Sequence, residues 1–212
     1  MNLSESLEQI SKELLALNVE FAVAGGLAAS LYRDQPRLTD DVDLAVAFSV
    51  PVVKLEAILT KLELSPTRVS EAQLKGGPKH LMKGKLSPIA ILVGRAKDKI
   101  GIDLLLPNLP WVETALKRAK SHLTNFGFGP LPTLTAEDVL LAKFYSLTCN
   151  SQRFKDLDDI QSIFRAQNSP DLAYLTGQMT ILKIPAPLQI EELPDAVRQA
   201  SRAITKKPSV KI

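Results

Sequence analysis

The hydrophobic pattern changes period twice in the first part of the chain. The opening segment has apolar residues at the spacing of an amphipathic helix: Leu3, Leu7, Ile10, Leu14 and Leu17. Residues 19–24 are apolar and rich in strand formers, whereas residues 27–32 return to a compact helical pattern. Gly25 and Gly26 stand between them and break both patterns. The sequence therefore predicts a helix, a strand, a glycine turn and a second helix.

Further along, strand and helix patterns mix. Residues 41–46 alternate polar and apolar positions, as a strand with one buried face does. Strands are also predicted at residues 89–93 and 100–106, joined by a charged turn as a hairpin or by a wider crossing. Helices are predicted at residues 53–62 and 111–120. This mixture indicates an α/β (α+β) domain, with a mixed β-sheet and flanking helices.

The character of the chain changes near residue 134. Beyond it, three helical patterns follow one another: residues 139–147, 154–165 and 172–182. We expect three parts: an α/β domain over residues 1–134, a small helical domain over residues 135–200 and a basic tail over residues 201–212. The tail is defined by its cations: Arg202, Lys206, Lys207 and Lys211.

Two motifs in the α/β part carry chemical information. The glycine turn leaves the first N–H groups of the next helix unpaired at the positive end of the helix dipole, where phosphate oxygens bind well. Asp41 and Asp43 stand two apart on a predicted strand and project to one face. Each motif alone is also explained structurally, by tight packing or by a solvated strand edge. Together they indicate a site for a metal and a nucleotide.

The motifs also resemble a known family. The pattern hydrophobic-Gly25-Gly26, a spacer and Asp41-Val-Asp43-Leu resembles the nucleotidyltransferase superfamily of the DNA polymerase beta type. The Gly-Gly-Leu-Ala form and the Arg-x-Thr lead-in to the aspartates are most similar to the bacterial type IV toxin–antitoxin nucleotidyltransferase toxins (AbiEii/AbiGii-like). The resemblance implies Mg²⁺-dependent transfer of a nucleoside monophosphate from an NTP to an acceptor hydroxyl, with an antitoxin as partner protein. Residues 1–134 would then be the catalytic domain, and residues 135–200 would close the nucleotide cleft.

The superfamily requires a third carboxylate on a neighbouring strand, and Asp103 is the acidic residue of the apolar run 100–106. The structural alternative is an aspartate held at a strand end by backbone donors. We expect Asp41, Asp43 and Asp103 to be the catalytic residues and metal ligands, because three carboxylates suit Mg²⁺. The resemblance implies two magnesium ions.

The resemblance also implies a set of nucleotide-binding residues: Gly25, Gly26, Arg37, Thr39, Lys143, Lys155 and Asp156. In the helical part, Lys143 would contact the triphosphate. Lys155 and Asp156 would organise the site or orient the base. A solvated helix face with ion pairs is the alternative for Lys143 and Asp156.

Composition argues against a disulfide-bonded, a zinc-binding or a membrane protein. The single cysteine, Cys149, cannot form an intramolecular disulfide, and with only two histidines the chain cannot assemble a zinc site of the usual ligands. No apolar run approaches the ~20 residues that span a bilayer, and no basic leader precedes an apolar stretch. We expect a cytoplasmic protein with no membrane partner.

Charge is distributed unevenly along the chain. The basic segment, residues 75–99, holds one acidic residue, Asp98, and seven cations: Lys75, Lys79, Lys83, Lys85, Arg95, Lys97 and Lys99. Because it interrupts the α/β part between the second and third aspartates, it predicts a basic wall for the phosphate backbone of an acceptor RNA. A solvated hairpin without a ligand is the alternative, since the segment lacks aromatic residues for base stacking.

Two other functions compete with this prediction. The first is a nucleotide-binding or protein-interaction module that has lost catalysis; the intact carboxylate triad argues against it, because clustered charge destabilises a site that binds no metal. The second is transfer to a small hydroxylated acceptor such as an aminoglycoside antibiotic. A polycationic acceptor needs an acidic cleft, which the basic segment disfavours.

Overall fold

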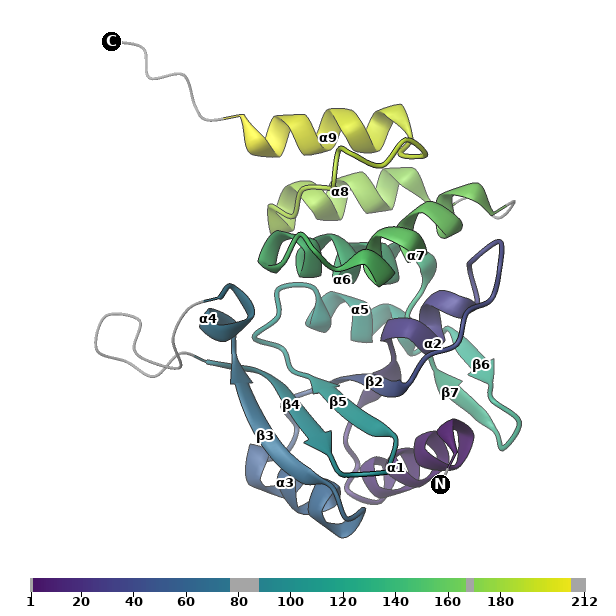
Figure 1. The fold of residues 1–212 in the computed structure, drawn as a ribbon, viewed down its shortest axis with the longest axis vertical. Helices are drawn as coiled ribbons and strands as arrows, with labels where there is room; N and C mark the ends of the chain where they lie inside the picture. The colour runs from purple at the N-terminus through teal and green to yellow at the C-terminus, as the bar shows by residue number, and fades with distance from the viewer. Residues whose placement is uncertain (1, 77–87, 167–169, 207–212) are drawn as a thin grey trace.

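A five-stranded sheet lies in the lower half of the molecule as drawn in Figure 1, between two groups of helices. The computed structural model describes residues 2–76, 88–166 and 170–206. The strands, in chain order, are β1 (Phe21–Val23), β2 (Asp41–Val46), β3 (Ser65–Ser70), β4 (Ile89–Arg95) and β5 (Gly101–Leu105). Their spatial order is β1-β2-β5-β4-β3, with β2 and β5 parallel and the other pairs antiparallel. The predicted mixed sheet is confirmed, and β4 and β5 form the hairpin alternative.

Helices cover both faces of the sheet. On one face lie α1 (Leu3–Ala16) and α3 (Val52–Lys61), packed on the even-numbered apolar residues of the central strands, such as Leu44 and Leu104. On the other lie α2 (Gly25–Ser30) and α5 (Val112–Ala119), followed by a small hairpin of β6 (Leu123–Asn125) and β7 (Pro130–Pro132). Successive side chains of a strand point to opposite faces. The odd-numbered aspartates of β2 and β5 therefore lie on the α2 and α5 face.

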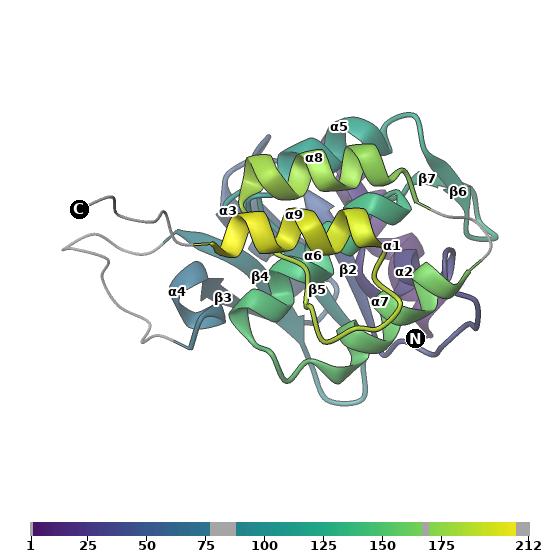
Figure 2. The same ribbon diagram turned by 90° about the horizontal axis from the view of Figure 1, so that it is seen from above.

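The helical part is stacked above that second face (Figures 1 and 2). Its helices are α6 (Ala136–Cys149), α7 (Phe154–Arg165), α8 (Leu172–Leu182) and α9 (Asp195–Thr205). The first three confirm the sequence patterns, whereas α9 was not predicted. Among the described residues, none of the helices combines the length and apolar composition needed to cross a membrane.

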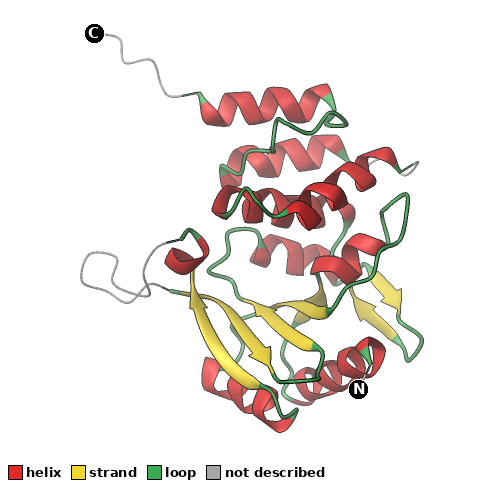
Figure 3. Cartoon of the chain, in the orientation of Figure 1, coloured by secondary structure: helices red, strands yellow, loops and turns green. Residues whose placement is uncertain are grey.

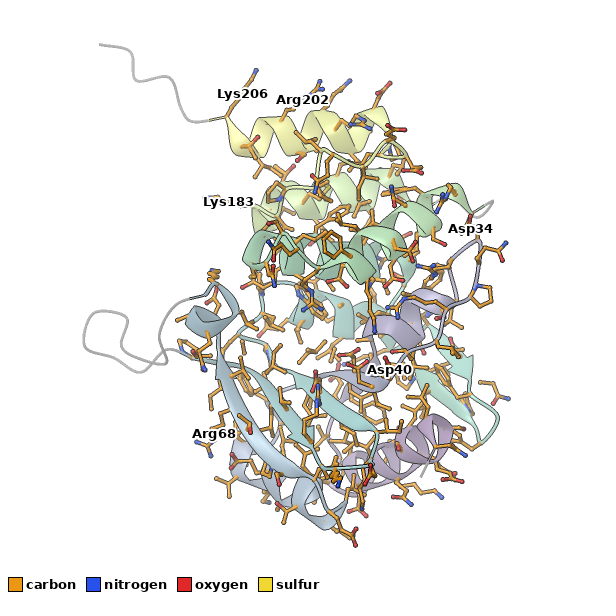
Figure 4. The ribbon with its side chains drawn as sticks, viewed as in Figure 1. Asp34, Asp40, Arg68, Lys183, Arg202 and Lys206 are labelled. Carbon is orange, nitrogen blue, oxygen red and sulfur yellow. The ribbon has the colours of Figure 1, made fainter. Side chains whose placement is uncertain are left out.

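The start of the predicted tail needs correction. Residues 201–205 belong to α9, so they are helical and not a frayed tail. Arg202 lies on this helix and Lys206 directly follows it, and both side chains project away from the rest of the molecule (Figure 4). Lys207 and Lys211 lie outside the described residues.

The sequence patterns also missed β3 and the short helix α4 (Glu71–Leu74), which follows it directly (Figure 3). Strand β3 reads Ser-Pro-Thr-Arg-Val-Ser and pairs with β4 alone, so it is an edge strand. An edge position tolerates Pro66 and exposed polar side chains, and for this reason the strand lacks the alternation by which buried strands are recognised.

The helical part and the sheet share one hydrophobic core. The cluster that contains Ala22 of β1 and Ala28 of α2 continues through Phe144 of α6 and Ile160 of α7 to Val197 of α9. Phe144 is fully buried within it. Because no layer of solvent separates the two parts, we expect them to unfold together.

This expectation is tested by two substitutions of the same residue type. Phe144→Ala should lower the free energy of unfolding by about 3–5 kcal/mol, because it removes buried apolar area and leaves a cavity. Phe154→Ala, at a side chain that is 76% exposed, should change it little. Urea unfolding followed by circular dichroism and by fluorescence should give coincident single transitions. Separate transitions for the two signals would show that the parts fold independently.

Candidate functional site

Two parallel strands bring the three predicted aspartates together. Asp41 and Asp43 lie on β2 and Asp103 lies on β5, where Asp43 and Asp103 are direct register partners. Each residue offers a carboxylate oxygen that lies within 4.8 Å of those of the other two, and all three are half-buried. This distance lets one cation contact all three. The oxygen-only donor set fits Mg²⁺.

The electrostatics of the cluster show that its counter-charge is incomplete, because Arg95 pairs with Asp103 alone. Burial, together with the neighbouring charges of Asp41 and Asp103, raises the pKa of Asp43 to about 7. Burial also raises the pKa of Asp103, although Arg95 opposes that rise with a bidentate ion pair at 2.5 and 2.9 Å. Clustered carboxylates with raised pKa values are typical of a site that is completed by a cation.

The glycine turn is shaped around Asp43. Gly25 has φ +58°, and a Cβ at this position would lie 1.8 Å from Oδ2 of Asp43. A Cβ on Gly26 would lie 2.6 Å from Oγ1 of Thr39. The backbone N–H of Gly26 hydrogen-bonds the Asp43 carboxylate and lowers its pKa. The assignment of Gly26 to the nucleotide stays a prediction.

The two predicted residues before β2, Arg37 and Thr39, contact acidic residues at the site. The Thr39 hydroxyl donates to Oδ1 of Asp41 at 3.1 Å and so orients that carboxylate. Arg37 donates two hydrogen bonds to Asp159 of α7, from Nε at 2.6 Å and from Nη2 at 2.8 Å. Its third contact is to the Leu38 carbonyl at 3.0 Å. Both predicted residues lie at the site, but Arg37 is engaged within the protein.

Asp159 is a second centre of charge, which the sequence analysis did not single out. Its side chain has no exposed surface and contacts three cations, two from the loop before β2 and one from α6. Besides Arg37, it pairs with Arg33 at 2.5 Å and with Lys143 of α6 at 2.5 Å. Burial alone would raise the pKa of Asp159, but the hydrogen bonds and charges of Arg37 and Lys143 bring it below the usual value. Asp159 thus ties the loop before β2 to helices α6 and α7.

The predicted residues of the helical part differ in their exposure. Lys143 is buried and also contacts Oδ1 of Asp156 at 3.0 Å, while Arg153 pairs with the other oxygen of Asp156. Asp156 thus positions two cations. Lys155 is 71% exposed and reaches Asp40 at 3.2 Å; Figure 4 shows Asp40 between the sheet and the helical layer. The alternative of a solvated ion-pair face is therefore contradicted for Lys143 and Asp156.

A cleft of about 520 Å³ joins these groups. All ten residues predicted from the sequence line it: Gly25, Gly26, Arg37, Thr39, Asp41, Asp43, Asp103, Lys143, Lys155 and Asp156. Arg95 and Arg153 line it as well. The cleft thus has the three aspartates and Arg95 on the sheet, and Lys143, Arg153, Lys155 and Asp156 on the helical part opposite.

Three of the four described cations of the basic segment form ion pairs within the chain, and the fourth, Lys97, is exposed. Lys75 pairs with Glu71, Lys99 pairs with Glu63 and Arg95 pairs with Asp103. Lys79, Lys83 and Lys85 lie outside the described residues. Arg95 thus belongs to the cleft and not to a separate basic wall.

A sequence signal for Asp159 did exist. Asp156 and Asp159 are three apart on a helix, which places them on one face, and the cation Arg153 is a further three residues back. This spacing indicates a charged face turned toward a partner. For Arg95, by contrast, only the pairing of β4 with β5 shows that its guanidinium reaches Asp103.

A family model described as "Nucleotidyl transferase AbiEii toxin, Type IV TA system" matches residues 10–207. No curated protein matches the chain. A solution structure of the antibiotic-resistance factor ANT(2'')-Ia has 15% identity and a TM-score of 0.49, covering 94% of this chain and 89% of that one. A crystal structure of ANT(2'')-Ia with adenylyl-2''-tobramycin has 15% identity and a TM-score of 0.49, covering 94% and 97%. An antigenic nucleotidyltransferase-like protein from Paracoccidioides brasiliensis has 19% identity and a TM-score of 0.46, covering 95% and 86%. Similarity at this level gives no information on the substrate.

The raised pKa of Asp43 predicts how the metal-free protein responds to pH. Because Asp43 holds its proton up to about pH 7 in the folded state and loses it near 3.8 when unfolded, the protein should lose stability as pH rises between these values. Asp43→Asn removes this loss. Chemical unfolding in a chelator should find the variant more stable than the parent at pH 8, by on the order of 1–3 kcal/mol, with the difference vanishing near pH 4. Asp98→Asn, at an exposed position, is the control; an equal gain there would refute the assignment to the cluster.

Removal of the Asp159 charge tests the second centre. Asp159→Asn should lower the free energy of unfolding by about 3–5 kcal/mol, because three cations lose their buried partner. The neighbouring Asp158 is 53% exposed and contacts Arg33, so Asp158→Asn should cost at most about 1 kcal/mol. Urea unfolding of both variants provides the measurement. Equal effects of the two substitutions would contradict the role given to Asp159.

Proposed function

Because the chain belongs to the AbiEii family of nucleotidyltransferase toxins of type IV toxin–antitoxin systems, we propose that it transfers a nucleoside monophosphate from an NTP to an acceptor hydroxyl on RNA. The observation that carries the proposal is the convergence of Asp41, Asp43 and Asp103 on one wall of a cleft whose other wall carries the cations Lys143, Arg153 and Lys155. Carboxylates for metal ions, facing cations for phosphates, are what phosphoryl-group transfer requires.

Asp41, Asp43 and Asp103 would hold the metal ions, and we expect two. When bound, two Mg²⁺ ions would activate the acceptor hydroxyl and stabilise the charge that develops at the α-phosphate. The Thr39 hydroxyl keeps Asp41 oriented, and the Gly26 N–H does the same for Asp43. The acceptor hydroxyl would give its proton to solvent water as its oxygen forms a bond to the α-phosphorus, and the bond to the bridging oxygen would break so that pyrophosphate leaves.

Lys143 is the residue we assign to the triphosphate. Its ammonium group has three donors, of which Asp156 and Asp159 use two. The third is left for a phosphate oxygen. Because two carboxylates already hold the ammonium group in place, little side-chain freedom is lost on binding.

The acceptor would approach at the cleft mouth. Arg153 and Lys155 line the cleft with side chains that are 53% and 71% exposed. Exposed cations attract the phosphates of a nucleic acid and repel a polycationic small molecule. They support RNA as the acceptor class better than the basic segment does, because they line the cleft itself, whereas Lys75, Lys97 and Lys99 of the basic segment do not. We expect the protein to act in the cytoplasm and to have an antitoxin partner protein.

Label transfer tests the proposal. The protein, Mg²⁺ and each of the four NTPs labelled at the α-phosphate should be incubated with total RNA, or with a panel of aminoglycosides in its place. We expect label on RNA with at least one NTP, and a loss of at least a hundredfold in rate for Asp103→Asn, since each ligand of the metal site is required. Asp98→Asn should match the parent. Label found only on small molecules would reject the RNA acceptor, and no label on either would favour the inactive module.

A further inference from the structure

One end of the cleft lacks the charged side chains that bind phosphates or metal ions. Beyond the triad the lining is apolar, formed mainly by Leu74, Ile91, Leu105, Trp111, Ala142 and Tyr145. Trp111 and Tyr145 are 4% and 7% exposed, so these side chains are deep and not part of the outer surface. An apolar recess with aromatic walls, continuous with a charged site, is suited to a ligand that is itself part charged and part aromatic.

The same elements lead from the charged end of the cleft to the apolar end. Strand β5 carries Asp103 and, two residues on, Leu105 on the same face, about 7 Å away. Helix α6 carries Lys143 and, six residues on, Cys149, about 9 Å along its axis. These distances are on the scale of one nucleotide. A molecule with its phosphates between Asp103 and Lys143 would place its other end in the apolar recess.

The recess is closed by helix α4. The Tyr145 hydroxyl donates to Oε1 of Glu71 at 3.0 Å, and Lys75 pairs with the same oxygen, so the end of α6 is tied to α4. A free nucleotide can enter such a recess from the charged end. The end of an RNA chain is better accommodated at the mouth, where Arg153 and Lys155 are exposed.

We propose that the apolar end of the cleft binds the base of the donor NTP, and that Gln73 reads the edge of that base. The inference rests on the proposed function and names the subsite that selects its nucleotide. Oε1 of Gln73 accepts from the backbone N–H of Ser70 at 3.0 Å. A backbone N–H is only a donor, so the amide orientation is fixed and the NH₂ group of Gln73 is the end turned toward a ligand. It would donate to a carbonyl oxygen or ring nitrogen of the base.

Trp111 provides a direct probe, because it is the only tryptophan in the sequence. Its fluorescence should be recorded during titration with each NTP, with inorganic tripolyphosphate and with an RNA oligonucleotide that lacks a 5′-triphosphate, all in Mg²⁺. We expect saturable changes with NTPs. Tripolyphosphate should bind by calorimetry and leave the fluorescence unchanged. The same fluorescence change with tripolyphosphate, or a change with the oligonucleotide alone, would overturn the proposal.

Two variants sharpen the test. Ala142→Leu fills the recess and should weaken NTP binding at least tenfold while tripolyphosphate binding is kept; Ala173→Leu, at an exposed position of α8, is its control.

Gln73→Glu keeps an oxygen for Ser70 and replaces the NH₂ donor by an acceptor, so the ratios of affinity among the four NTPs should change at least fivefold. Gln199→Glu on α9 should leave them unchanged. Unchanged ratios in Gln73→Glu, or equal loss of NTP and tripolyphosphate in Ala142→Leu, would refute the proposal. The binding measurements do not depend on transfer, so a protein that binds NTPs as described but labels no acceptor would refute only the proposed function.

Discussion

The repulsion among three carboxylates is the constraint on which the rest of the site depends. Asp43 is the most affected, because it is desolvated and has Asp41 and Asp103 as neighbours. The backbone around Asp43 adopts an unusual conformation to make room for its carboxylate. Gly25 adopts a left-handed conformation with no side chain because the Asp43 carboxylate occupies the space where a Cβ would stand. The N–H of Ala24 binds the Asp43 carbonyl at 2.9 Å, which fixes the strand against the turn. A protein that had no cation to bind there would gain stability by losing one of these charges.

The helical part completes the site through a second, opposite arrangement. Here one buried carboxylate, Asp159, holds several cations, so that Lys143 and Arg37 keep defined positions beside the triad. The pairs cross from the loop before β2 to α6 and α7, and the core around Phe144 is continuous with that of the sheet. The cleft is therefore formed by both parts together. Asp156 was expected to organise the site or to orient the base. It lies buried in the lining of the cleft, where it positions Lys143 and Arg153.

Much of the fold and of the site could be predicted from local patterns. Asp41 and Asp43 share a face because strand side chains alternate, and the glycine turn follows from two breakers between a strand and a helix. The rest depends on contacts between distant segments. The register that places Asp103 beside Asp43, the reach of Arg95 across β5 and the existence of the edge strand β3 are set by pairing and not by local sequence. Helix α9 was missed although its polar and apolar residues separate onto two faces, because it is mostly polar and Val197 is its one fully buried apolar residue. The division of the chain at residue 134 remains a prediction.

The central claim is that the three aspartates bind metal ions in order to hold a nucleotide. Calorimetric titration of an NTP, with and without Mg²⁺, into the parent protein and into Asp43→Ala tests it most directly. The account predicts that NTP binding to the parent protein depends on Mg²⁺ and that this dependence is lost in the variant. Equal metal-dependent binding by both proteins would contradict it.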